Sequence, residues 1–111
     1  MTTFDRLVGQ VVAVTDLDGA VEDFRRCGFA LADRSARPEW GIDTATFGFR
    51  DGCYLELVTS IDPSHEIGGT VDRFLRRRGE GLYMTTIEVP DVAVAYEERL
   101  AELMPSAAPI A

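Results

Sequence analysis

Polar side chains at every second position mark one part of the sequence as the best candidate for chemistry. Thr44 and Thr46 alternate with apolar residues in one run, and Tyr54 and Glu56 do so in the next. Since successive side chains of a strand point to opposite faces, these four share one face of a sheet. That face suits either a ligand-binding concavity or an ordinary solvated surface. An enclosed Glu56 would have a raised pKa and act as a general base, whereas a hydrogen-bonded or solvated Glu56 would not.

Three further candidates for ligand contact lie outside these two runs. In a later alternating run, Met84 would form an apolar wall of the site and Glu88 a polar contact on the same side. Trp40 lies in a loop rich in proline and glycine, where it would either cover a ligand or fill the open side of the sheet. Glu88 has the weaker case for a function, because nothing in the sequence encloses it.

The basic run has two interpretations. Arg76, Arg77 and Arg78 are consecutive in an otherwise acidic chain. Arginine binds phosphate through paired hydrogen bonds, so the run would form a phosphate site. Equally, three arginines at the end of a helix would form a solvated face that complements the helix dipole.

Histidine and cysteine usage excludes several kinds of centre. With one histidine, His65, the chain forms neither a histidine-based triad nor a two-histidine metal site. Cys27 and Cys53 have neither disulfide-framework nor metal-ligand spacing, and their apolar neighbours predict buried, reduced thiols. Such centres are therefore excluded within one chain. We also expect no cofactor.

Periodicity and turn residues predict the elements that position these side chains. Asp16 or Asp18 would cap the first helix and Gly28 would end it. Arg50-Asp51-Gly52 would form a hairpin turn. We expect strands at residues 10–15, 29–33, 43–49, 53–59 and 82–89, loops at 35–41 and 61–70, and helices at 18–26, 71–78 and 92–103.

A repeat at a constant offset organises the chain. Asp16 is echoed by Asp91 and Ala20 by Ala95, each 75 residues later. Each copy reads as a strand, an aspartate turn and an amphipathic helix. Further strands follow the first helix, whereas the second copy stops soon after its helix.

Composition and charge restrict the partners. The 111 residues include 19 acidic and 11 basic side chains, a net charge of −8, which disfavours binding to nucleic acid or to an anionic membrane surface. Hydrophobic residues make up 46%, as in a folded domain, and no apolar run approaches the roughly 20 residues of a membrane span. The first residues do not resemble a secretory signal, so we expect a cytoplasmic protein.

Three runs together resemble the vicinal oxygen chelate superfamily, which includes glyoxalase I, methylmalonyl-CoA epimerase, extradiol dioxygenases and bleomycin-resistance proteins. They are Arg-Pro-Glu-Trp-Gly at 37–41, Arg-Asp-Gly-Cys-Tyr-Leu-Glu-Leu at 50–57 and Phe-Leu-Arg-Arg-Arg-Gly-Glu-Gly-Leu at 74–82. The likeness to epimerase-like members is greatest. The resemblance implies an α+β fold in which βαβββ modules surround an open, cup-shaped mixed sheet with helices outside. It divides a single domain, 1–111, into a first module at 7–60, a linking loop and helix at 61–81 and a truncated second module at 82–111.

The resemblance also bears on metal and phosphate. Family members usually hold a divalent metal with a histidine on the first strand of each module and a carboxylate or glutamine on a later strand. Here Gly9 and Met84 occupy the two histidine positions, and only Glu56 matches a ligand position. One oxygen ligand is too few to hold a catalytic divalent ion, so we predict that the usual metal is missing. Epimerase relatives bind a CoA thioester, which would give the three arginines a phosphate partner.

Three functions remain open. The first is a lyase or isomerase of the glyoxalase or epimerase type, acting on a small carbonyl compound or acyl-CoA thioester with Glu56 as the base. The second is a metal-free protein of the bleomycin-resistance type that binds a small organic ligand, which we favour. The third is a fragment or degenerate subunit that serves assembly. An incomplete second module would leave a strand edge unpaired, so we also expect a homodimer.

Overall fold

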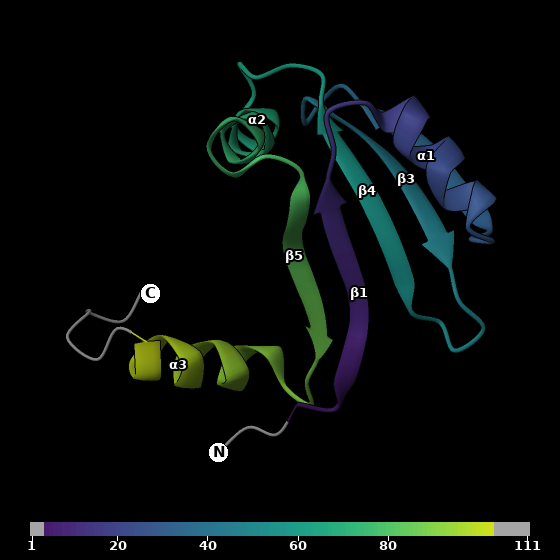
Figure 1. The fold of residues 1–111 in the computed structure, drawn as a ribbon. Helices are drawn as coiled ribbons and strands as arrows, with labels where there is room; N and C mark the ends of the chain where they lie inside the picture. Colours follow the sequence, from purple (N-terminus) through teal and green to yellow (C-terminus); the bar gives the residue numbers. More distant parts are fainter. Residues whose placement is uncertain (1–3, 104–111) are drawn as a thin grey trace. The chain divides into compact units, whose positions relative to one another are not determined.

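The computed structural model describes residues 4–103, and these form a mixed α+β fold with one five-stranded sheet (Figure 1). The strands lie in the order β2-β3-β4-β1-β5, with β1 parallel to β4 and the β2–β3 and β3–β4 pairs antiparallel. The chain divides into two compact units, Val8–Thr86 and the segments on either side of it. In chain order the elements are β1 (Arg6–Ala13), α1 (Leu17–Arg26), β2 (Leu31–Arg37), β3 (Ile42–Gly48), β4 (Tyr54–Ser60), α2 (Glu66–Arg78), β5 (Gly81–Glu88) and α3 (Val92–Leu103).

Helix α1 covers one face of the sheet over β3 and β4 (Figure 1). Its apolar stripe, which includes Leu17 and Val21, packs on Phe47 and Leu57. This is the arrangement that the alternating pattern predicts, because every second residue of β3 and β4 is apolar. Burying these side chains contributes roughly 1.5–3 kcal/mol each.

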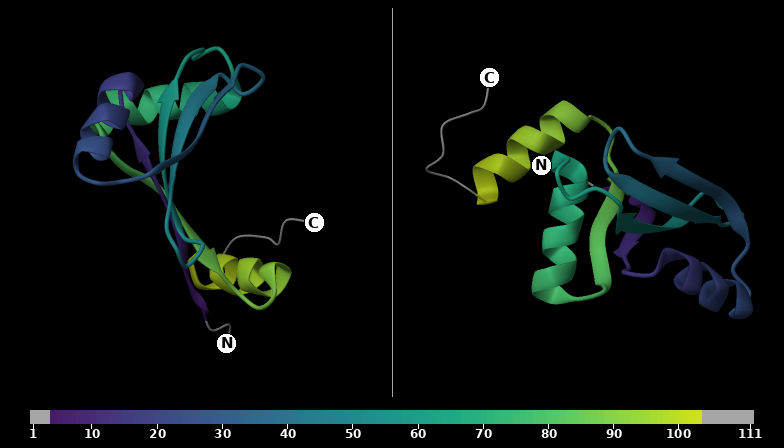
Figure 2. Two further views of the ribbon diagram at one scale, coloured as in Figure 1. Left: turned by 90° about the vertical axis from the view of Figure 1, so that its right-hand side faces the viewer. Right: turned by 90° about the horizontal axis from the view of Figure 1, so that it is seen from above.

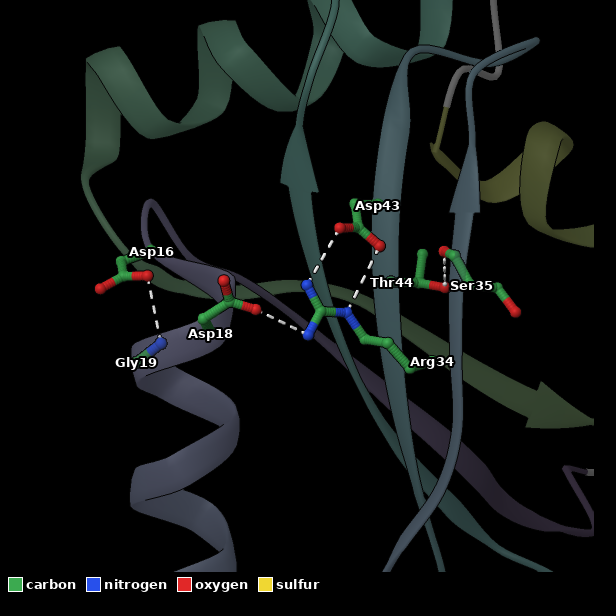
Figure 3. Close-up of polar contacts among 7 residues, drawn as sticks. All are labelled: Asp16, Asp18, Gly19, Arg34, Ser35, Asp43 and Thr44. Carbon is green, nitrogen blue, oxygen red and sulfur yellow. Dashed lines mark hydrogen bonds and ion pairs between the residues drawn. The ribbon is translucent and has the colours of Figure 1, made fainter.

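The predicted boundaries of α1 are confirmed. Asp16 is the N-cap, and its carboxylate accepts a hydrogen bond from the backbone N–H of Gly19 at 3.1 Å (Figure 3). Gly28, just past the helix, has a φ of 99°, a left-handed conformation that glycine adopts without strain. Gly52 in the predicted hairpin turn has a φ of 86°.

Helix α2 packs against one end of the opposite face. Its buried Val71 contacts a cluster that includes Ala13, Ile42 and Val58. The left view of Figure 2 shows the helix lying across one end of the strands. There the rings of Phe74 and Tyr83 meet edge to face, 5.1 Å apart. Because α2 covers only one end of this face, the polar side chains farther along β3 and β4 remain partly exposed.

Three predicted elements have wrong boundaries. The first strand, β1, runs from Arg6 to Ala13 rather than over residues 10–15. The other two errors lie around residues with polar or loop-forming side chains. Helix α2 begins at Glu66, five residues earlier than expected, within the segment 61–70 predicted as loop. Strand β2 extends to Arg37, into the segment predicted as loop from residue 35. Here β2 pairs residue by residue with β3 up to Arg37 opposite Ile42, and this pairing overrides the weak strand propensity of its sequence.

The second β-α unit follows the 75-residue offset of the sequence repeat. Strand β5 begins at residue 81 against 6 for β1, and α3 begins at 92 against 17 for α1. The helix start is repeated as well: Asp91 accepts a hydrogen bond from the backbone N–H of Val94 at 3.2 Å, as Asp16 does from that of Gly19.

The prediction for the thiols is right in one respect and wrong in another. Both cysteines are free, but Cys27 is exposed and Cys53 only partly buried. Cys27 follows the last helical residue of α1 as its C-cap, so it lies beyond the apolar stripe that would have buried it.

None of the helices in the described part of the chain is both long and apolar enough to span a membrane.

Candidate ligand-binding face of the sheet

Strand register brings the predicted polar residues onto one face. Thr46 lies opposite Glu56 across the β3–β4 pair, Thr44 lies opposite Val58, and Tyr54 pairs with Gly48. The residues between them point the other way, into the core under α1. The two threonines, Tyr54 and Glu56 therefore share the face that α1 leaves uncovered.

Glu56 is a half-buried carboxylate with no hydrogen bond or ion pair to any described residue. Loss of solvent raises the pKa of Glu56, and the nearby positive charge of Arg37 offsets part of this rise. A carboxylate of this kind accepts a hydrogen bond or a proton from a bound molecule more readily than a solvated one.

Tyr54 lies two residues before Glu56 on β4, and its side chain extends over the adjacent strand β1. Its ring lies directly over Gly9, so that a Cβ atom on Gly9 would overlap the ring. The phenol oxygen is 3.0 Å from the hydroxyl of Thr86 on β5. Tyr54 thus connects three strands and forms the floor of the face next to Glu56.

Arg37 is the residue of this face that the sequence analysis missed as a site residue. It lies on the same face as Ile42, which contacts α2, and its guanidinium carbon is 5.1 Å from the centre of the Trp40 ring. Trp40 is 44% exposed, so the pair lies at the margin of the face. Extending the predicted strand from residue 33 to 37 would have placed Asp33, Ser35 and Arg37 on the ligand side.

Thr44 is buried, and its hydroxyl is used in a hydrogen bond within the sheet. It is 4% exposed, and its hydroxyl donates to the carbonyl of Ser35 at 3.1 Å (Figure 3). Thr46 is only partly buried, and its hydroxyl forms no hydrogen bond with a described residue, so of the two threonines it is the one accessible to a ligand.

Within the described residues, no hydrogen bond or ion pair joins the remaining candidates to Glu56. Arg76 forms an ion pair with Asp72 at 2.9 Å and lines a cavity of about 230 Å³ with Thr15, Ser60 and others, while Arg77 and Arg78 are exposed. Met84 on β5 is exposed.

Glu88 belongs to the other compact unit. It is 3.8 Å from Arg6 in an ion pair. Its backbone carbonyl accepts a hydrogen bond from Asp5.

The donor set does not fit the metal of the resembling family. At the two expected histidine positions, Gly9 lies beneath the Tyr54 ring and Met84 offers only a thioether, a poor ligand for a hard divalent ion. Within residues 4–103, no three histidine, cysteine, aspartate or glutamate side chains lie close enough to share an ion.

Comparisons with known proteins agree with this geometry. A family model described as a glyoxalase-like domain matches residues 10–107. Methylmalonyl-CoA epimerase of Streptomyces coelicolor, in a complex with 2-nitronate-propionyl-CoA, is 27% identical with a TM-score of 0.68, covering 87% of this chain and 71% of that one. The Mycobacterium tuberculosis epimerase is 26% identical with a TM-score of 0.68, covering 90% and 65%. Comparison with curated proteins finds no significant match.

A hypothetical protein from Bacillus halodurans, 20% identical with a TM-score of 0.67 over 92% of this chain and 68% of that one, shares the fold. The chain spans about two thirds of the length of these structures. The family match covers most of the sequence, and the five-stranded sheet with its helices matches the fold of the epimerases. The chain belongs to the glyoxalase-like domain family, within the vicinal oxygen chelate superfamily.

Proposed function

We propose that this protein binds a small organic molecule on the sheet face formed by Thr46, Tyr54 and Glu56, with Trp40 at its margin. The proposal rests on one observation: Glu56 is a half-buried carboxylate that forms no hydrogen bond or ion pair with any described residue. Leaving such a group without a partner costs free energy, which a hydrogen-bond donor on a ligand would recover. The protein uses its own side chains for this binding rather than the usual divalent ion of its superfamily.

A fragment screen by NMR in the presence of EDTA tests this proposal. Small hydroxyl- or amide-bearing compounds should shift the resonances of Thr46 and Tyr54, and Glu56→Gln should weaken the binding. Glu39→Gln, which changes an exposed loop carboxylate, should leave binding unchanged. Fragments that bind only when EDTA is omitted, or only elsewhere on the protein, would overturn the proposal.

A second function is supported by the epimerase neighbours and by the raised pKa of Glu56. Glu56 would take a proton from the carbon beside a carbonyl group, as a lyase or isomerase of the epimerase type acting on an acyl-CoA thioester. In that case the phosphates would lie near Arg76, Arg77 and Arg78.

Deuterium exchange distinguishes the two functions. An enzyme of this type would exchange the proton next to the thioester carbonyl of methylmalonyl-CoA for deuterium in D₂O, and Glu56→Gln would abolish the exchange. A binding protein would bind without exchange.

We also propose that the protein is a cytoplasmic homodimer. Two free cysteines suit a reducing compartment. Strand β5 is a sheet edge among the described residues. We propose that residues 7–60 form a first module, 61–81 a linker and 82–111 the start of a second module. A partner copy would then cover the apolar side chains of this second module.

A further inference from the structure

Two arginines on β2 differ in what their side chains bind. Arg34 and Arg37 are three residues apart, so they point to opposite faces of the sheet. Arg34 binds two carboxylates, that of Asp18 at 2.8 Å and that of Asp43 at 3.1 Å, and Figure 3 shows the guanidinium between them. These contacts tie β2 to α1 and β3 and raise the pKa of Arg34, chiefly through the hydrogen bond to Asp43. Arg34 is therefore a structural residue.

Arg37 binds no carboxylate within ion-pair distance among the described residues. Its guanidinium instead lies over the ring of Trp40, at 5.1 Å. An aromatic ring attracts the cation through its face and leaves the N–H groups at the edge of the guanidinium plane available for hydrogen bonds. The pairs of N–H groups at that edge match the two oxygens of a carboxylate.

The backbone fixes the Trp40 loop beneath this guanidinium. The N–H of Trp40 donates to the carbonyl of Arg37 at 3.0 Å, and the carbonyl of Trp40 accepts from Gly68 in α2 at 2.9 Å. The N–H of Gly41 donates to Pro38 at 3.1 Å. A cation held in place before binding loses less conformational entropy when it meets its ligand.

We propose that Arg37 is the specificity-determining residue of this face and that it binds a carboxylate of the ligand. A hydrogen-bond donor or acidic C–H group in another part of the same ligand then contacts Glu56. The inference rests on the proposed function and adds the ligand class, a small carboxylic acid. Glu56 repels an anion, so the ligand binds with its carboxylate toward Arg37 and its neutral part toward Glu56. In a chain of net charge −8, a cation without a carboxylate partner is what admits an anionic ligand to this face.

NMR titration with a charged and a neutral probe of the same shape tests the inference. Malonamate, which has one carboxylate and one amide, is compared with malonamide, which has two amides, with the indole N–H of Trp40 as the reporter. We expect malonamate to bind about tenfold more tightly than malonamide, the difference that one charge-assisted contact gives. Arg37→Gln should remove this preference, and Arg37→Lys should keep only part of it because an ammonium lacks the planar pair of donors.

Arg25→Gln is the matched control, since Arg25 lies on α1 at the other face and its loss changes the net charge equally. It should leave the preference unchanged. Equal affinities for the two probes, no response of Trp40, or a preference that persists in Arg37→Gln would overturn the inference. So would inorganic phosphate binding as tightly as malonamate, since the site would then recognise any oxyanion. If neutral fragments still bind beside Glu56 in EDTA, the proposed function stands although the inference fails.

Discussion

At the scale of single residues, the face around Glu56 combines a carboxylate that no described residue bonds with a tyrosine ring that covers a glycine. Tyr54 fills the space above Gly9, the position where the resemblance to the superfamily implies a metal-binding histidine. The alternating pattern was enough to predict that Thr46, Tyr54 and Glu56 share a face. It was not enough to predict Arg37, because its neighbours Ser35 and Ala36 carry no strand signal.

Removing the charge of Glu56 should change how stability depends on pH. Burial raises the pKa of Glu56, so the folded protein retains a proton that the unfolded chain releases. Its contribution to stability is present below the ordinary carboxyl pKa and is lost as the pH rises through the raised value. Glu56→Gln should therefore be more stable than the wild type above that window and equally stable below it, as measured by urea denaturation from pH 4 to 8. The opposite trend would show that Glu56 is stabilised as an anion.

The contact between Tyr54 and Gly9 predicts a non-additive pair of substitutions. Gly9→Ala should lower the free energy of unfolding by about 1–3 kcal/mol, because the new methyl group overlaps the ring. In a Tyr54→Ala background the same change should cost much less. Gly81→Ala, with nothing within 4 Å of its new Cβ, is the control. Equal costs in the two backgrounds would mean that the ring does not occupy this space.

At the scale of elements, local signals predicted helix starts well and close packing poorly. The two aspartates that begin α1 and α3 form the expected hydrogen bonds. The start of α2 was missed because Gly68 and Gly69 read as helix breakers. A Cβ on Gly68 would overlap the carbonyl oxygens of Asp62 and Gly41, so this glycine allows the helix to approach the loop that carries Trp40. Nothing in the local sequence distinguishes a glycine that permits close approach from one that ends a helix.

Gly68→Ala tests this role. Alanine favours a helix over glycine by about 1 kcal/mol, so a helix limited only by propensity would become more stable. We expect instead a net loss of about 2 kcal/mol, because the methyl group meets two backbone oxygens that cannot move independently. Thr70→Ala, at an exposed position of the same helix, should change stability by less than about 0.5 kcal/mol. Denaturation in urea measures both.

At the scale of the whole molecule, the two β-α units differ in what their helices bury. In α1, Leu17 is 4% exposed and Val21 is 8% exposed; their counterparts in α3, Val92 and Tyr96, are 75% and 54% exposed. The first helix has the core strands β3 and β4 beneath it. Exposed apolar side chains in such numbers are characteristic of a surface that another chain covers.

A homodimer should therefore form through the exposed apolar side chains of the second β-α unit, which include Val92 and Tyr96. Light scattering of the purified protein should give the mass of two chains. Val92→Glu combined with Tyr96→Glu should raise the dimer dissociation constant by at least about tenfold, since burial of each side chain contributes roughly 1.5–3 kcal/mol. Ile67→Glu, at an exposed apolar position in α2, is the control. A monomer at all concentrations would contradict the proposed assembly.

Titration with Co²⁺, followed by visible absorbance and metal analysis, tests most directly whether this face binds its ligand through Glu56 itself. Because this face offers one carboxylate, Glu56, and has Gly9 and Met84 at the expected histidine positions, we predict weak binding without a defined stoichiometry, the same in Glu56→Gln as in the wild type. Tight one-to-one binding that Glu56→Gln abolishes would show that the carboxylate serves a metal ion instead.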